Sequence, residues 1–149
     1  MKYSECKPGR IYVICLENGD IVHQEIEQFA RDQSIKAASL IIIGGADKDS
    51  KLIVGPKNDK AMPVSPREYV LDKVHDIVGA GTLFLDQKDN PVLHLHMACW
   101  RESSTITGCI RRGVKVWHTM EVILFELLES KGKRILDPET GFTLLKLEK

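Results

Sequence analysis

The sequence has no excess of either charge sign, because 21 Lys and Arg residues balance 21 Asp and Glu residues. A domain dedicated to nucleic acid usually carries a clear basic excess, so this balance argues against tight DNA binding by the chain alone. The chain also lacks any apolar run that approaches the ~20 residues of a membrane-spanning helix. Its first residues show no secretory signal pattern. We therefore expect a cytoplasmic protein without a membrane partner.

Cysteine is scarce and lacks the Cys-x-x-Cys spacing of many metal and redox sites. The chain has four cysteines, which are Cys6, Cys15, Cys99 and Cys109. A chain of 149 residues with 43% apolar content can bury a core without disulfide bonds, so we expect free thiols. The length also suits one domain, and no repeat or linker divides residues 1–149.

Most of the patterned segments predict β-strands, because β-branched and aromatic residues gather in short runs between turn residues. One segment has a clear helical period, with Val22, Ile26, Phe29 and Ala30 on one face. Residues 116–128 fit either a strand or a helix, and their β-branched and aromatic content favours a strand. The expected strands are residues 11–16, 37–43, 52–54, 69–71, 77–85, 92–100, 105–111, 116–128 and 142–147. The sequence therefore predicts an α+β fold with one main helix and a mostly antiparallel sheet.

The segment from Pro91 to Met97 contains two histidines, His94 and His96, that are separated by one apolar residue. On a β-strand successive side chains point to opposite faces, so both imidazoles would project from one face of a sheet. On a helix the same spacing would not place them on one face. A strand at this position would therefore let a single cation contact both rings.

Cys109 is the first candidate for a third ligand. If residues 92–100 and 105–111 form a hairpin, opposite side chains lie ~5 Å apart, and the alternation lets Cys109 face the same side as the two histidines. His118, one strand further along the chain, is the candidate fourth ligand, and water or a group from a neighbouring subunit are the alternatives. Mixed nitrogen and sulfur ligands favour zinc, or another divalent transition metal, over magnesium and calcium.

Two other interpretations of the histidine pair stay open. Such a pair often belongs to the polar face of a half-solvated sheet that binds no ion. A site with an open coordination position could also serve a small metal-dependent enzyme that polarises a substrate or activates water. Known enzyme patterns match poorly, because the cupin motif needs a glutamate three or four residues after the pair and Glu102 comes too late. The Pro-Cys-x-x-Cys part of the zinc deaminase signature is absent.

Short motifs along nearly the whole chain fit one family pattern when they are taken in order. Residues 91–96 read Pro-x-x-His-Leu-His, and residues 108–113 read Gly-Cys-Ile-x-x-Gly. The other motifs lie at residues 10–16, 19–21, 29–30, 37–45, 119–122 and 134–141. In this order and spacing they resemble the PPC domain, a family conserved in plants and prokaryotes, from residue 10 to about residue 142.

The resemblance implies a mostly antiparallel α/β domain that assembles as a homotrimer. Prokaryotic members carry a DNA-binding label, although in plant relatives a separate AT-hook contacts DNA and the PPC domain mediates assembly and partner binding. The family's histidines in the two motifs resemble a metal site, and Cys109 replaces the third of them. Because thiolate is also a zinc ligand, we expect a zinc-binding homotrimer whose further partner is DNA or a DNA-bound protein. The apolar residues on both faces of residues 116–128 agree with a surface covered by another subunit.

Overall fold

Eight strands form one antiparallel sheet in the computed structural model, which describes residues 1–60 and 62–147. The sheet order is β1-β8-β2-β5-β6-β7-β3-β4, and β9 and β10 form a separate two-stranded hairpin. The strands are β1 (Lys7–Glu17), β2 (Ala37–Ala46), β3 (Lys51–Pro56), β4 (Pro66–Val70), β5 (His75–Leu85), β6 (Pro91–Arg101), β7 (Ser104–Cys109), β8 (Val116–Leu128), β9 (Gly132–Leu136) and β10 (Thr143–Leu147). The predicted α+β class with a mostly antiparallel sheet is confirmed.

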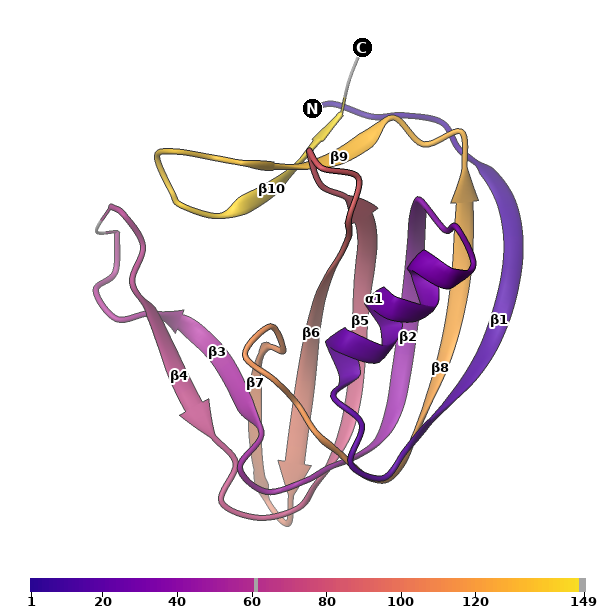
Figure 1. Ribbon diagram of the computed structural model, residues 1–149. Coiled ribbons are helices and arrows are strands. Elements are labelled where there is room, and N and C mark those ends of the chain that lie inside the picture. Colours follow the sequence, from indigo (N-terminus) through magenta and orange to yellow (C-terminus); the bar gives the residue numbers. More distant parts are fainter. Residues whose placement is uncertain (61, 148–149) are drawn as a thin grey trace.

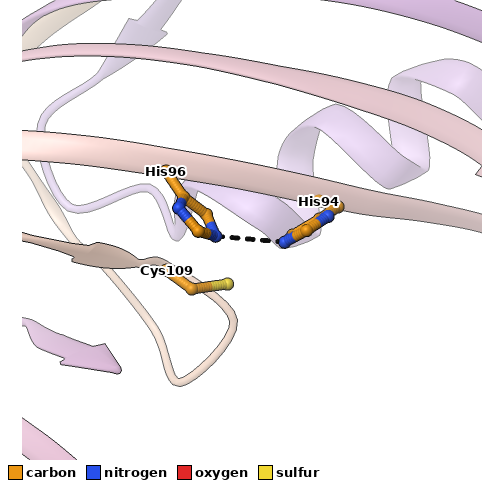
Figure 2. Close-up of side chains that lie close together, drawn as sticks. All are labelled: His94, His96 and Cys109. Atoms are coloured by element: carbon orange, nitrogen blue, oxygen red, sulfur yellow. Dashed lines mark hydrogen bonds between the residues drawn. The ribbon is translucent and has the colours of Figure 1, made fainter. Parts of the chain in front are cut away.

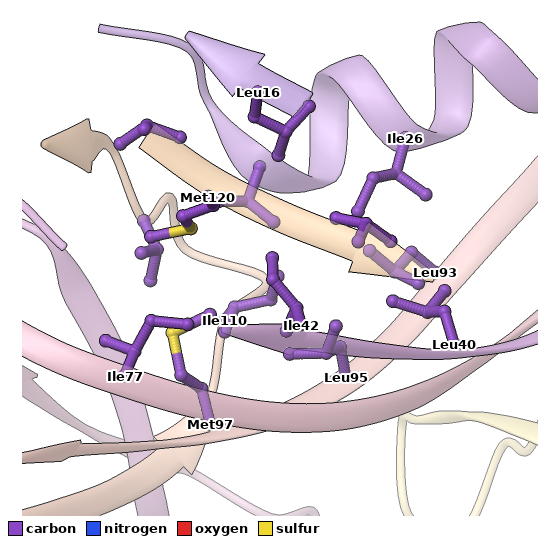
Figure 3. Close-up of a cluster of buried hydrophobic side chains, with 14 of the residues drawn as sticks. Leu16, Ile26, Leu40, Ile42, Ile77, Leu93, Leu95, Met97, Ile110 and Met120 are labelled. Atoms are coloured by element: carbon purple, nitrogen blue, oxygen red, sulfur yellow. The ribbon is translucent and has the colours of Figure 1, made fainter. Parts of the chain in front are cut away.

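Helix α1 (Val22–Asp32) lies across one face of the sheet (Figure 1). Buried side chains of the helix and the strands form the hydrophobic core. Val22, Ile26 and Ala30 are the buried residues of the helix, as the helical period predicts. Inward side chains of the strands meet them, and Figure 3 shows Leu40, Ile42, Leu93, Leu95, Met97 and Met120 in this cluster. In the described part of the chain, no helix has the length and apolar character needed to cross a bilayer.

The ambiguous segment 116–128 is a single long strand, β8, at the bounds that the sequence predicts. The main difference is β9, which the sequence analysis missed. This strand has a charged residue, Arg134, at its one buried position, so it lacks the apolar alternation that marks a strand. Its structure depends on pairing with β10, in which Leu145 is the partner of Arg134.

The sheet face opposite α1 carries apolar side chains that stay exposed. The apolar residues at successive positions of 11–16 and 116–128 predict that both faces of these strands are buried. Within one chain, only the side chains that point toward the core are buried. Val13 is 80% exposed and Ile41 is 51% exposed. Other exposed apolar residues on this face are Ile11 of β1, Ile43 of β2, Val78 of β5 and Phe125 of β8. We refer to Ile11, Val13, Ile41, Ile43, Val78 and Phe125 as the outer apolar face.

Candidate metal centre

Strands β6 and β7 place the three predicted ligands on one side of the sheet. His94 and His96 alternate with the buried Leu93 and Leu95, so both imidazoles point away from the core. Cys109 is the direct cross-strand partner of His96 in the antiparallel pair of β6 and β7. The structure therefore brings together the three residues that the sequence analysis selected.

Glycine in β5 lets this neighbouring strand lie close behind the histidine pair. A Cβ atom added at Gly81 would lie 2.6 Å from the His94 carbonyl oxygen, and one at Gly79 would lie 2.8 Å from the His96 carbonyl oxygen. These distances are too short for an unstrained contact, so a side chain at either position would displace the backbone that carries the histidines. The backbone of β6 is thus held against β5 at both candidate ligands.

The ligand atoms lie close enough to share one ion. The Nε2 atoms of His94 and His96 are 3.1 Å apart, and these atoms and the Cys109 sulfur all lie within 4.8 Å of one another (Figure 2). Two imidazole nitrogens at ~2.0–2.1 Å from a tetrahedral zinc would be about 3.3 Å apart. The donor set and its spacing therefore fit a zinc ion with three protein ligands and one further position.

The surroundings keep one imidazole in the form that binds metals. Burial is the largest cause, and together with the electrostatic effects of Arg134, His96 and Arg111 it lowers the pKa of His94 to about 4. The ring is therefore neutral at pH 7, and only a neutral imidazole has a lone pair free for a metal. Cys109 is 6% exposed, and the Nε–H of Arg111 donates to its sulfur at 3.2 Å. This donor fixes the position of the candidate sulfur ligand.

A pocket of about 290 Å³ opens beside the three ligands. Its walls are His94, His96, Cys109, Ile53, Gly55, Arg111, Arg134, Phe142, Thr143 and Leu144. Arg134 belongs to β9 and the last two to β10, so the hairpin forms one side of the pocket. The sequence analysis placed no residue of this hairpin at the site, because nothing in its pattern shows that it folds back onto β5.

His118, the candidate fourth ligand, does not join the group within one chain. It lies on β8, and strands β2 and β5 separate β8 from β6 in the sheet. Its backbone N–H donates to Asn18, and its ring packs edge-on against Trp117. His118 lies apart from the group in one chain because β8 follows β7 along the sequence but returns to pair with β1 and β2.

Several basic residues near the ends of the strands are paired with acidic groups or buried. Arg112 pairs with Glu68 at 3.0 Å, and Lys115 pairs with Asp47 at 2.6 Å. Lys133 likewise pairs with Asp89 at 3.2 Å, and Arg134 is buried. These cations already face acidic groups or the interior, which leaves few of them free to neutralise phosphates.

Comparison with solved structures shows the same fold in two bacterial and archaeal proteins. A metal-containing protein from Archaeoglobus fulgidus superposes with a TM-score of 0.83 at 22% identity, over 98% of this chain and 99% of that one. A candidate DNA-binding protein from Ralstonia eutropha JMP134 superposes with a TM-score of 0.69 at 24% identity, over 92% of this chain and 91% of that one.

Sequence comparison adds a curated relative and a family. The chain is 29% identical over 142 residues to the bifunctional protein GlmU of Synechococcus sp. (strain JA-3-3Ab), and the match covers 94% of this chain but only 21% of that protein. The model of the Plants and Prokaryotes Conserved (PCC) domain matches residues 3–128, which is most of the chain. With this match and the shared fold, the chain belongs to the Plants and Prokaryotes Conserved domain family, the PPC family that its motifs resemble.

Proposed function

We propose that this protein is a regulatory assembly module, a cytoplasmic homotrimer that holds one zinc ion in each subunit. In this proposal its partners are copies of itself and DNA or a DNA-bound protein. The observation that carries the proposal is the position of the candidate ligands on the same sheet face as the exposed apolar residues. Register places Val13, Ile123, Ile41, Ala80, His96 and Cys109 in one row across six strands.

The outer apolar face is the support for self-assembly. Ile41 and Ile43 belong to a central strand of the sheet, and both are 51% exposed. Val78 and Phe125 lie on the strands to either side of that strand, so the apolar residues form a continuous surface. Contiguous apolar surface on a soluble chain usually marks a protein interface, and closed symmetric assemblies are the commonest way to cover it.

Two observations support zinc. The His94, His96 and Cys109 donor set combines nitrogen and sulfur, which zinc accepts and which magnesium and calcium do not prefer. The structural neighbour from Archaeoglobus fulgidus is described as containing a metal. When bound, zinc would either fix the strands that carry it or act as a Lewis acid at its remaining position.

The regulatory part of the proposal follows from the family and from the charge. The structural neighbour from Ralstonia eutropha is described as a candidate DNA-binding protein. This chain has a formal net charge of zero, and Arg112, Lys115 and Lys133 of its basic clusters are paired with acidic groups. We infer that contact with DNA depends on a partner protein or on assembly and not on one subunit alone.

Sedimentation velocity tests the assembly. We expect wild-type protein at micromolar concentration to sediment as a species of about 50 kDa, three times the 16.8 kDa chain. Ile41→Lys places a charge in the outer apolar face and should dissociate the assembly. Gln24→Lys adds the same charge on the exposed side of α1, as a matched control, and should leave it intact. A stable wild-type monomer would remove the assembly from the proposal.

A second candidate function is a small metal-dependent enzyme. The pocket of about 290 Å³ beside His94, His96 and Cys109 favours it, because a purely structural zinc site is normally closed by four protein ligands. In that case the open position would polarise a bound carbonyl or activate a water molecule. The pocket alone does not specify a reaction.

A further inference from the structure

Arg134 brings a positive charge into the pocket without a carboxylate to balance it. The residue is 4% exposed, and one of its terminal nitrogens donates to the Thr82 hydroxyl at 2.8 Å. Its Nε–H is buried and has no hydrogen-bond partner among the described residues. A buried N–H group without an acceptor costs free energy, and most such groups in folded proteins are paired. The geometry thus leaves one donor of a buried guanidinium free beside the candidate metal ligands.

Arg111 adds a second cation to the lining of the pocket. Its Nε–H donates to the Cys109 sulfur, and its guanidinium carbon lies 5.7 Å from the centre of the Phe142 ring. Among the described residues, neither arginine forms an ion pair, and no acidic residue lines the pocket. Burial and the charge of Arg111 both lower the pKa of Arg134, as expected for two cations that share a site without a counter-charge.

The rest of the pocket is apolar and belongs largely to the C-terminal hairpin. Ile53, Phe142 and Leu144 line it together with the charged groups, and the Phe142 ring lies under the Arg111 guanidinium. Arg134, Phe142 and Leu144 all lie beyond residue 128, where the match to the family model ends. These three pocket residues therefore lie outside the part of the chain that the family model matches, whereas Arg111 and Ile53 lie within it.

We propose that this pocket binds a small organic carboxylate with an apolar tail. The carboxylate would accept hydrogen bonds from Arg134 and Arg111, and the tail would lie against Phe142 and Leu144. A planar guanidinium matches a planar carboxylate in shape and charge, and a volume of about 290 Å³ suits a small ligand. The inference deepens the proposed function, because it rests on the zinc site and supplies a group for its remaining position.

Isothermal titration of the zinc-loaded full-length protein tests this inference. The probe is 3-methylbutanoate, in a buffer free of carboxylate and phosphate. Its uncharged amide, 3-methylbutanamide, and inorganic phosphate are the comparison ligands. We expect 3-methylbutanoate to bind with a dissociation constant in the millimolar range or below and the amide not to bind. Arg134→Gln should weaken binding at least ~10-fold, because hydrogen bonds to a charged group are lost.

Two further variants keep the test decisive. Arg111→Gln changes an exposed side chain, so it should fold even if Arg134→Gln does not, and it should also weaken binding. Arg112→Gln is the matched control, because Arg112 pairs with Glu68 away from the pocket, and it should bind like wild type. Equal binding by wild type and both pocket variants would overturn the inference, as would tighter binding of phosphate than of the carboxylate.

Elemental analysis before each titration separates failure of the inference from failure of the zinc site. Protein that contains zinc but does not bind 3-methylbutanoate would refute the carboxylate site and leave the proposed zinc site standing. Protein that takes up no zinc but binds the carboxylate through Arg134 would refute the metal part of the proposed function and support the anion site on its own.

Discussion

Zinc should stabilise the folded protein through His94, His96 and Cys109, and the size of this effect can be estimated. The ligands meet only when β6 and β7 pair, so the unfolded chain should bind zinc far less well than the folded chain. At a free zinc concentration 100 times the dissociation constant, the stabilisation is roughly 2.7 kcal/mol. For a chain of 149 residues, 1 kcal/mol shifts the melting temperature by roughly 2–4 °C. We therefore expect zinc to raise the melting temperature by about 5–11 °C relative to protein stripped with a chelator.

Three variants and two measurements decide whether this reasoning is right. His96→Ala should abolish the zinc-dependent shift in a thermal melt, and elemental analysis should find less than one zinc per chain. Cys109→His should keep the zinc-dependent shift and the bound zinc, because imidazole replaces thiolate as a ligand and restores the family pattern. His118→Asn is the matched control: it removes an imidazole from β8 and retains a residue that tolerates the positive φ of 59° at that position. If wild-type protein shows no shift and binds no zinc, the histidine pair is a polar sheet face and the enzyme alternative also falls.

Two other expectations can be checked on the same preparations. DNA binding by the isolated chain should be weak, because the formal net charge is zero, and it should be sensitive to salt. Nanomolar, sequence-selective binding near physiological salt in a gel-shift or anisotropy assay would contradict this expectation. The ion pair of Arg10 and Glu126 should make the free energy of unfolding sensitive to acid, because the hydrogen bond from Arg10 lowers the pKa of Glu126. The stabilisation is fully present at pH values above the ordinary pKa of glutamate, and it is lost as the pH falls through the lowered pKa of Glu126. Urea unfolding of wild type and Glu126→Gln at pH 7 and pH 3 measures this loss, and an equal acid response in both proteins would show that the pair does not cause it.

The grouping of the three candidate ligands was predictable because it depends on local rules. The alternation of side chains along a strand fixes the common face of His94 and His96, and the short connection between two strands makes Cys109 a cross-strand neighbour. The single helix and the strand at residues 116–128 follow from the same periodicities. These features require no knowledge of how distant parts of the chain meet.

The features that the sequence did not predict depend on contacts between distant segments. His118 follows the ligand strands in the chain but lies on β8, on the other side of β2 and β5, because sequence order does not determine strand order in a sheet. Arg134 looks like a solvent-exposed residue in a basic cluster. It is buried because the β9–β10 hairpin brings it to Thr82 and places its guanidinium near the Phe84 ring. No local pattern marks such a residue as part of a site.

Val13, Ile41 and His96 lie in one row on the same face of the sheet, so metal binding at His96 would depend on protein concentration. If other subunits cover the outer apolar face, as proposed, they also restrict the approach of solvent and chelators to His96 from that side. An ion held there would then leave slowly from the assembled protein and faster from separated subunits. Dilution would in this way act on metal retention without any change in the ligands themselves. The protein would release its ion most readily where its own copies are few.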